Sequence, residues 1–204
     1  MGLDQYIFKT YEPVFSIINN DEDYDRLERK VNDCVSVYHN DPESHFVIST
    51  KDWCYFSKGH AIAAFLLPYS CYVKNAYDYT RIISLNNMTL LYEKCLLFID
   101  VINKYFKHEG NDITIDYIYN NFKNGWKFSC EMGETYKNSD FVSDLKNVIF
   151  LNSNDEDANE VDKICWWNLP YYFDLAIYLH HYLVVKPELK YKDGNPISLF
   201  YIEG

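Results

Sequence analysis

The chain has 204 residues, and its content of 48% hydrophobic and 18% aromatic residues excludes an intrinsically disordered protein. Its 30 acidic residues outnumber 19 basic ones and give a formal net charge of −11, which disfavours direct binding to DNA or RNA. This charge suits a basic partner, or a nucleic-acid-binding protein whose groove an acidic surface could fill, although solubility alone also accounts for it. The length fits one domain, and we expect residues 1–204 to form it.

The cysteines and the hydropathy pattern indicate a cytoplasmic protein. The cysteines lie 17 to 35 residues apart and form no Cys-x-x-Cys pair, which is typical of buried free thiols rather than of a zinc site or a disulfide framework. No stretch resembles a signal peptide, and no window reaches 18 uninterrupted apolar residues, so we expect no contact with a membrane. The six cysteines are Cys34, Cys54, Cys71, Cys95, Cys130 and Cys165.

The first eighty residues predict short strands alternating with helices. Aromatic and β-branched residues at 3–8 predict a strand, and apolar residues spaced three and four apart at 24–34 predict a helix. A strand is expected at 45–49. Ser57 can cap a helix that ends before Pro68, because proline cannot continue the amide ladder. Residues 81–83 are a possible short strand.

The segment 84–110 is the strongest helix in the sequence, and we expect the rest of the chain to be organised around it, with a helical span of about 85–108. Ser84 can cap its start and Gly110 can close its end in a left-handed conformation. One apolar stripe comprises Met88, Leu91, Tyr92, Cys95, Phe98, Ile99, Ile102, Tyr105 and Phe106. A second apolar face comprises Leu90, Leu97 and Val101, so we expect this helix to be covered on most sides.

The second half of the chain predicts further helices and a final strand. In order, the expected elements are a helix at 113–122, a strand at 126–130, a helix at 139–149 capped by Ser139, an acidic loop at 152–160, a last helix opened by Asn168 and Pro170, and a strand at 197–202 after a turn at 193–196. The fold class that follows is α+β: a helix-rich single domain around the long central helix, with a small sheet formed by the N- and C-terminal strands.

The opening residues resemble a known family. The start Met1-Gly2-Leu3-Asp4-Gln5-Tyr6-Ile7-Phe8 is similar to small phage and prophage proteins that begin Met-Gly-Leu-Asp-Met-Tyr-Leu. Their later Trp-Arg-Lys-x-Asn-x-Ile-His segment corresponds to residues 56–63, where Lys58 and Ile62 match and Phe56, Ser57, His60 and Ala63 differ. The resemblance implies a phage or mobile-element gene expressed in a bacterial cytoplasm, whose product binds and inhibits a host protein, as anti-CRISPR and other anti-defence inhibitors do.

One group of residues is a candidate ligand site. Asp4, Tyr6, Lys58 and His60 would meet if the first strand lies beside the helix that Ser57 caps. A lysine and a histidine near an acid and an aromatic ring suit an anionic small ligand, such as a nucleotide stacked on Trp53 or Tyr55. The simpler interpretation is that these polar groups only satisfy one another.

A second group is a candidate surface for binding a partner. It consists of Asp155, Glu156, Asp157, Glu160 and Asp162, followed by the tryptophan pair Trp166 and Trp167. With the acidic cluster at 21–25, these carboxylates would imitate a phosphate array if they converge, and the tryptophans would supply binding energy. The alternatives are ordinary solvated loops and core packing of the tryptophans.

No motif indicates an enzyme, a metal or a cofactor. The chain lacks a glycine-rich phosphate loop, a Gly-x-Ser-x-Gly elbow and a His-Glu-x-x-His helix. His180 and His181 point about 100° apart on a helix and so cannot bind the same metal ion, and His39 and His45 lack a recognised ligand spacing. We therefore expect no catalytic residue and a protein that inhibits a host protein, such as a defence nuclease, by binding it. The first alternative is a protein that binds or sequesters nucleotides, and a hydrolase is a distant third; the oligomeric state stays open.

Overall fold

The structure is a computed structural model of the whole chain. It describes residues 5–9, 53–56, 60–72, 80–122, 124–150, 169–187, 189–190, 194 and 196–203. The helix expected at 24–34, the strand at 45–49 and the acidic loop at 152–160 lie outside these residues.

The two ends of the chain meet in an antiparallel sheet of five strands, ordered β2-β1-β5-β4-β3. The strands are β1 (Gln5–Lys9), β2 (Trp53–Phe56), β3 (Cys71–Tyr72), β4 (Thr80–Ser84) and β5 (Ser198–Glu203). The N-terminal β1 pairs with the C-terminal β5, with Ile7 opposite Tyr201. The sheet is wider than the expected pair of end strands, because β2 joins at one side and β4 and β3 at the other.

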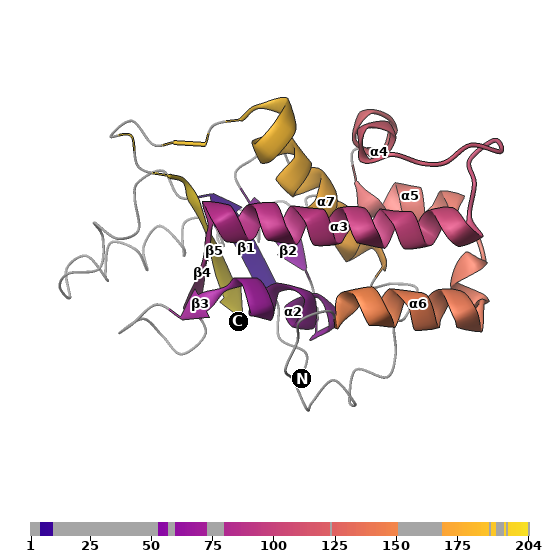
Figure 1. Cartoon of the computed structure of the whole chain (residues 1–204), viewed down its shortest axis with the longest axis horizontal. Coiled ribbons are helices and arrows are strands. Elements are labelled where there is room, and N and C mark those ends of the chain that lie inside the picture. The colour runs from indigo at the N-terminus through magenta and orange to yellow at the C-terminus, as the bar shows by residue number, and fades with distance from the viewer. Residues whose placement is uncertain are drawn as a thin grey trace, which may run out of the picture.

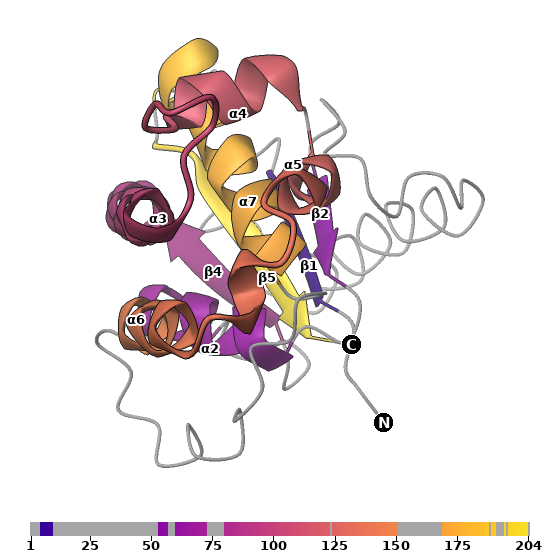
Figure 2. The same ribbon diagram turned by 90° about the vertical axis from the view of Figure 1, so that its right-hand side faces the viewer.

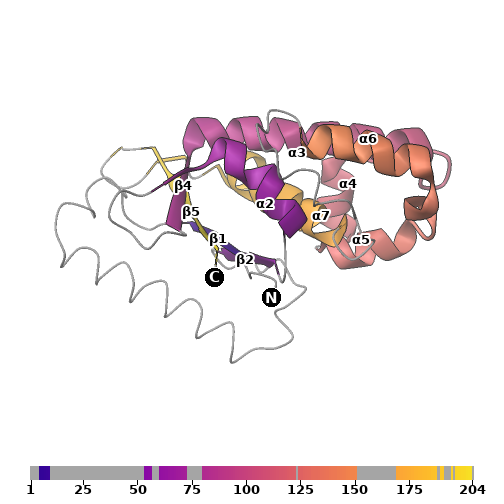
Figure 3. The ribbon, with the colours of Figure 1, turned by 90° about the horizontal axis from the view of Figure 1, so that it is seen from below.

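Helices make up most of the described chain, so the expectation of a helix-rich fold is confirmed. They are α2 (His60–Leu66), the 3₁₀ turn η3 (Leu67–Tyr69), α3 (Leu85–Tyr105), α4 (Ile115–Asn121), α5 (Gly125–Glu131), the 3₁₀ turn η4 (Thr135–Lys137), α6 (Ser139–Ile149), α7 (Leu169–His180) and the π-helical turn η7 (His181–Val185). In Figure 1, α3 runs along the long axis of the molecule, and α2 and α6 follow one another beside it. Figure 3 shows the helices gathered to one side of the strands.

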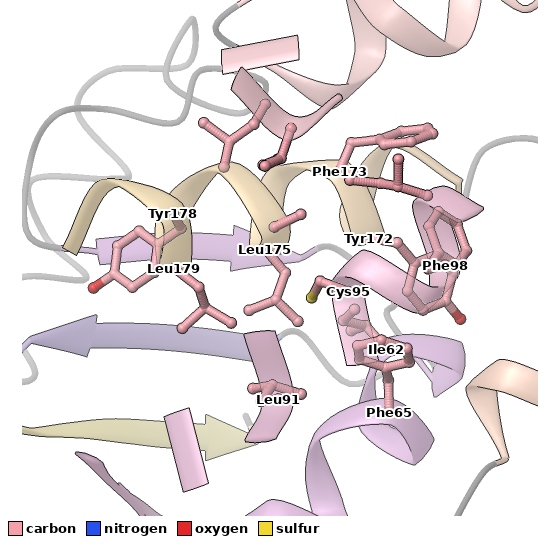
Figure 4. Close-up of a cluster of buried hydrophobic side chains, with 14 of the residues drawn as sticks. Ile62, Phe65, Leu91, Cys95, Phe98, Tyr172, Phe173, Leu175, Tyr178 and Leu179 are labelled. Carbon is pink, nitrogen blue, oxygen red and sulfur yellow. The ribbon is translucent and has the colours of Figure 1, made fainter. Parts of the chain in front are cut away.

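Helix α7, rather than α3, is the most deeply buried element. Every residue of α7 except Tyr171 is buried, and Figure 2 shows α7 between the sheet, α3 and α5. Its rings make close edge contacts: Tyr172 lies 5.2 Å from Phe65, and Phe173 lies 4.6 Å from Phe128, measured between ring centroids. Figure 4 shows how side chains of α7, α3 and α2 meet in this core. The last helix therefore joins the sheet to the other helices.

Helix α3 departs from the expectation in two ways. Its second apolar face is not covered, since Leu90 is 49% and Leu97 is 45% exposed, whereas Val101 is buried. The helix also ends at Tyr105 instead of near residue 108. It ends early because the side-chain amide of Asn103 pairs with both backbone groups of Ile113, at 2.7 and 2.9 Å, and so holds the returning chain against the last turn.

Gly110 does have the left-handed backbone that was expected, but it belongs to a tight turn beyond the helix. Its φ is +82°, and the turn is closed by backbone hydrogen bonds between His108 and Asn111. The cap at the start of α3 is confirmed, because the hydroxyl of Ser84 accepts a hydrogen bond from the amide of Asn87.

The strand expected at residues 126–130 is wrong, because these residues belong to helix α5. Asn124 caps this helix by accepting a hydrogen bond from the amide of Lys127. The alternation of large residues at 126–130 suggested a strand and so hid this helix cap. The cap of α6 also shifts by one residue: Asn138 accepts from the amides of Asp140 and Phe141, and Ser139 is the first helical residue.

The cysteines are only partly as expected. Cys71, Cys95 and Cys130 are free thiols, and Cys95 is buried in the core, where desolvation raises its pKa. Cys71 and Cys130 are exposed, so the expectation of buried thiols is wrong for these two. Within the ranges that the structure describes, no helix is long and apolar enough to cross a membrane.

Candidate functional site

The predicted ligand site falls mainly on residues whose side chains the structure does not describe. Tyr6 lies in β1 and Trp53 in β2, and these strands pair antiparallel with Tyr6 opposite Tyr55 and Phe8 opposite Trp53. His60 is the first residue of α2, which follows β2 closely in the chain. The backbone thus brings three of the five predicted residues into one region. The other two, Asp4 and Lys58, lie outside the described residues.

The predicted partner-binding residues all lie outside the described part of the chain. These are Asp155, Glu156, Asp157, Glu160, Asp162, Trp166 and Trp167. The acidic cluster at 21–25 also lies outside it. Convergence of the two acidic segments on one surface therefore stays a prediction.

An exposed acidic and apolar stripe on α3 is the candidate partner-binding surface of the described structure. Leu90, Glu93, Leu97 and Asp100 follow one another at intervals of three or four residues, which places them on one face of the helix; we call them the α3 outer face. All four are exposed, and the two leucines are among the large apolar side chains that the fold leaves in solvent. Sequence periodicity identified the leucines but assigned them to the core.

The α3 outer face carries a negative charge, because the charge of Lys104, the nearest lysine on the same side of the helix, is balanced by its ion pair with Asp144. The ammonium of Lys104 lies 3.3 Å from Oδ2 of Asp144 on α6, and the same oxygen accepts a hydrogen bond of 2.9 Å from the hydroxyl of Tyr105. The Tyr105 hydrogen bond, and then Lys104, lower the pKa of Asp144. The carboxylates of Glu93 and Asp100 thus set the sign of this face.

A cluster of histidines and tyrosines lies where α3, α4 and α7 meet. Nδ1 of the buried His180 lies 2.7 Å from the hydroxyl of Tyr92 on α3, and Nδ1 of His181 lies 2.7 Å from the hydroxyl of Tyr119 on α4. Nε2 of His180 lies 3.1 Å from Oδ1 of Asp116 but makes no hydrogen bond of normal geometry. Each histidine therefore ties the end of α7 to a different helix.

The electrostatics of this cluster fit a tether rather than a catalytic group. Burial lowers the pKa of His180, although Asp116 opposes the shift, and burial raises the pKa of Tyr92 to about 12. At neutral pH the pair is thus an uncharged imidazole and an uncharged phenol, and its hydrogen bond satisfies two partly or fully buried polar groups. Among the described residues, no three histidine, cysteine or acidic side chains are arranged to hold a metal ion.

Two other buried ionisable residues also have structural partners. The ammonium of Lys94 donates a hydrogen bond of 2.8 Å to the carbonyl oxygen of Ile149, the last residue of α6, and lies 4.3 Å from the centroid of the Phe65 ring. Asp174 accepts a hydrogen bond from the amide of Gly125 at the start of α5. Both side chains satisfy backbone groups at helix ends, which explains their burial without a catalytic role.

Comparisons with protein-family models, with curated proteins and with solved structures found no significant match. The choice of a candidate site therefore depends on the contacts and charges of this chain. On these grounds the α3 outer face is the best candidate, since the buried polar groups described above have structural partners, whereas no other part of the described chain covers the face.

Proposed function

We propose that the protein is a phage or mobile-element product that binds a host protein in the bacterial cytoplasm and inhibits it. The observation that carries this proposal is the α3 outer face, where two exposed leucines alternate with two acids along one rigid helix. Single exposed apolar residues are common, but two on one helical stripe provide paired anchor points. The similarity of residues 1–8 to phage proteins supports the biological context.

The α3 outer face combines binding energy with selectivity. Leu90 and Leu97 are about half exposed, so covering them contributes about 1 kcal/mol each. Glu93 and Asp100, in a chain with a net charge of −11, attract a basic surface and repel an acidic one. A nucleic-acid-binding host protein, such as a defence nuclease, presents a basic surface of this kind. The acidic residues at 155–162 and the pair Trp166 and Trp167 stay predicted contacts for the same partner, and a stable interface usually covers about 800 Å² per partner.

A matched set of variants tests this function. The tagged protein is used to capture partners from a lysate of the bacterial host, and a captured protein is then purified and its affinity measured at several salt concentrations. We expect Leu90→Asp/Leu97→Asp to abolish binding, and Glu93→Lys/Asp100→Lys to weaken it most at low salt, because the Debye length shortens as salt rises. Glu109→Lys/Glu131→Lys is the control, since it changes the net charge equally at exposed positions away from the face. Equal weakening by both charge reversals would show that only net charge matters, and unchanged binding by the leucine variant would exclude the face.

The second candidate function is the binding or sequestering of nucleotides. It is supported by the pairing of β1 with β2, which brings the backbone of Tyr6 near that of Trp53, with His60 close behind in the chain. Calorimetric titration with mono- and dinucleotides tests it. Binding that is lost in Lys58→Ala and His60→Ala would favour this candidate, and no heat with any nucleotide would remove it.

A further inference from the structure

The exposed residues of α3 follow one line along the helix. Apart from Thr89, every exposed residue of α3 lies on this line, which comprises Asn86, Leu90, Glu93, Leu97, Asp100 and Lys104. The residues are alternately four and three positions apart, which is the spacing along which one helix packs against a second helix in a coiled coil. Figure 2, which views α3 end on, shows the helix at the outer edge of the molecule.

The chemistry of this line repeats every seven residues. Leu90 and Leu97 occupy equivalent positions of successive heptads, about 10.5 Å apart along the helix, and so do Glu93 and Asp100. A helix that runs along α3 therefore meets apolar and acidic layers in turn. Its complement carries apolar residues opposite the leucines and lysine or arginine opposite the acids, each at heptad spacing.

A second copy of this chain does not provide that complement. If two copies of α3 ran parallel, equivalent layers would meet, and Glu93 and Asp100 would each face their own counterpart. If the two copies ran antiparallel, the leucine layers would face the acidic layers and bury a carboxylate against an apolar side chain. Both arrangements cost free energy, so the face favours a different chain.

We propose that the α3 outer face docks a basic amphipathic helix of its partner protein, which lies lengthwise along α3. This inference rests on the proposed function, because it specifies the element of the partner that the same face recognises. Leu90 and Leu97 contribute apolar contact area, and Glu93 and Asp100 select a partner of opposite charge. Helices are commonly recognised through anchors spaced in this way.

Three synthetic peptides test the proposal on the intact protein. Each is about 21 residues long, which is enough to form a helix. The basic peptide repeats leucine at the first and lysine at the fourth position of each heptad, with alanine and glutamine elsewhere. The acidic peptide has glutamate in place of lysine. The scrambled peptide has the composition of the basic one, with its leucines and lysines distributed around the helix.

Binding is followed by NMR of leucine methyl groups labelled with ¹³C, a method that also detects weak complexes. We expect the basic peptide to shift the signals of Leu90 and Leu97 and to bind about tenfold more tightly than either control peptide. The signals of Leu175, which is buried in the core, should not move. Equal affinity for the basic and scrambled peptides would mean that charge alone attracts them and would overturn the proposal, as would the absence of shifts with every peptide.

A charge-reversed variant tests the alignment. Glu93→Lys/Asp100→Lys should prefer the acidic peptide to the basic one, whereas Glu109→Lys/Glu131→Lys, with the same change in net charge, should keep the original preference. Failure of the preference to reverse would show that the peptide does not lie along α3.

The result is separable from the test of the proposed function. If the peptides fail while Leu90→Asp/Leu97→Asp still abolishes binding of the host protein, the helical partner element is wrong and the proposed function stands. If the peptides succeed while the leucine variant binds the host protein normally, the face does bind a basic helix and the proposed function is wrong.

Discussion

The amide of Gly125 donates a hydrogen bond of 2.6 Å to Oδ1 of Asp174, a carboxyl group buried within α7. This bond satisfies one of the free amides at the start of α5 and fixes α5 directly against α7. The approach is so close that α5 begins with the one residue type that has no side chain. Burial raises the pKa of Asp174 to about 7, and the Gly125 hydrogen bond opposes this shift only partly.

The variant Gly125→Ala should destabilise the fold strongly. A Cβ at this position would overlap the carbonyl oxygen of Pro170 and come within 2.8 Å of Cβ of Phe173. Because the backbone of α7 cannot move without disturbing the core, we expect a loss of about 3 kcal/mol in the free energy of unfolding, measured by urea denaturation. Gly110→Ala is the control: its Cβ would meet nothing within 4 Å, so only the left-handed backbone, at about 1 kcal/mol, opposes it. Equal losses for the two variants would contradict the packing of α5 on α7.

Asp174 should make stability fall as pH rises from about 4 to about 7. Its pKa in the folded protein, about 7, exceeds the ordinary value of 3.8, so in this window the folded state binds more protons than the unfolded state. Asp174→Asn keeps an oxygen acceptor for the amide of Gly125 but cannot ionise. Relative to the original chain, we expect this variant to gain up to about 4 kcal/mol between pH 4 and pH 8, measured by urea denaturation. Parallel pH profiles for the two proteins would mean that Asp174 titrates normally.

Local sequence signals predicted α3 and its start well, since Ser84 caps the helix and its apolar stripe recurs at helical spacing. They failed at its end, because the contact of Asn103 with Ile113 is tertiary. They also failed for Leu90 and Leu97, because periodicity shows that residues share a face but not whether another element covers it.

The contacts in the candidate sites were also beyond prediction from local sequence. The hydrogen bond between His180 and Tyr92 joins residues 88 positions apart, and no sequence motif indicates it. The buried and exposed faces of α5 could not be predicted because residues 126–130 were assigned to a strand, which would have pointed alternate side chains to opposite faces. The two ends of the chain, by contrast, were expected to form strands, and β1 and β5 do pair with each other.

Lys94 should make stability rise with pH above about 8. Its ammonium is buried, and desolvation lowers its pKa from 10.5 to about 8, so between these values the unfolded state binds more protons. Lys94→Met removes this titration. We expect the original chain to gain about 3 kcal/mol relative to Lys94→Met between pH 8 and pH 10.5, measured by chemical denaturation. A flat difference between the two profiles for Lys94→Met would exclude a buried ammonium.

Tyr92→Phe should cost more stability than Tyr119→Phe, although both remove one hydroxyl that bonds to Nδ1 of a histidine at 2.7 Å. His180, the partner of Tyr92, is only 1% exposed, so water cannot replace the lost hydroxyl, and we expect a loss of about 2 kcal/mol. His181 is only partly buried, so water can reach it, and the loss in Tyr119→Phe should stay below about 1 kcal/mol. Thermal and urea unfolding at pH 7.5, where His180 is neutral, measure both effects. A larger loss for Tyr119→Phe would show that α4, rather than α3, holds the end of α7 in place.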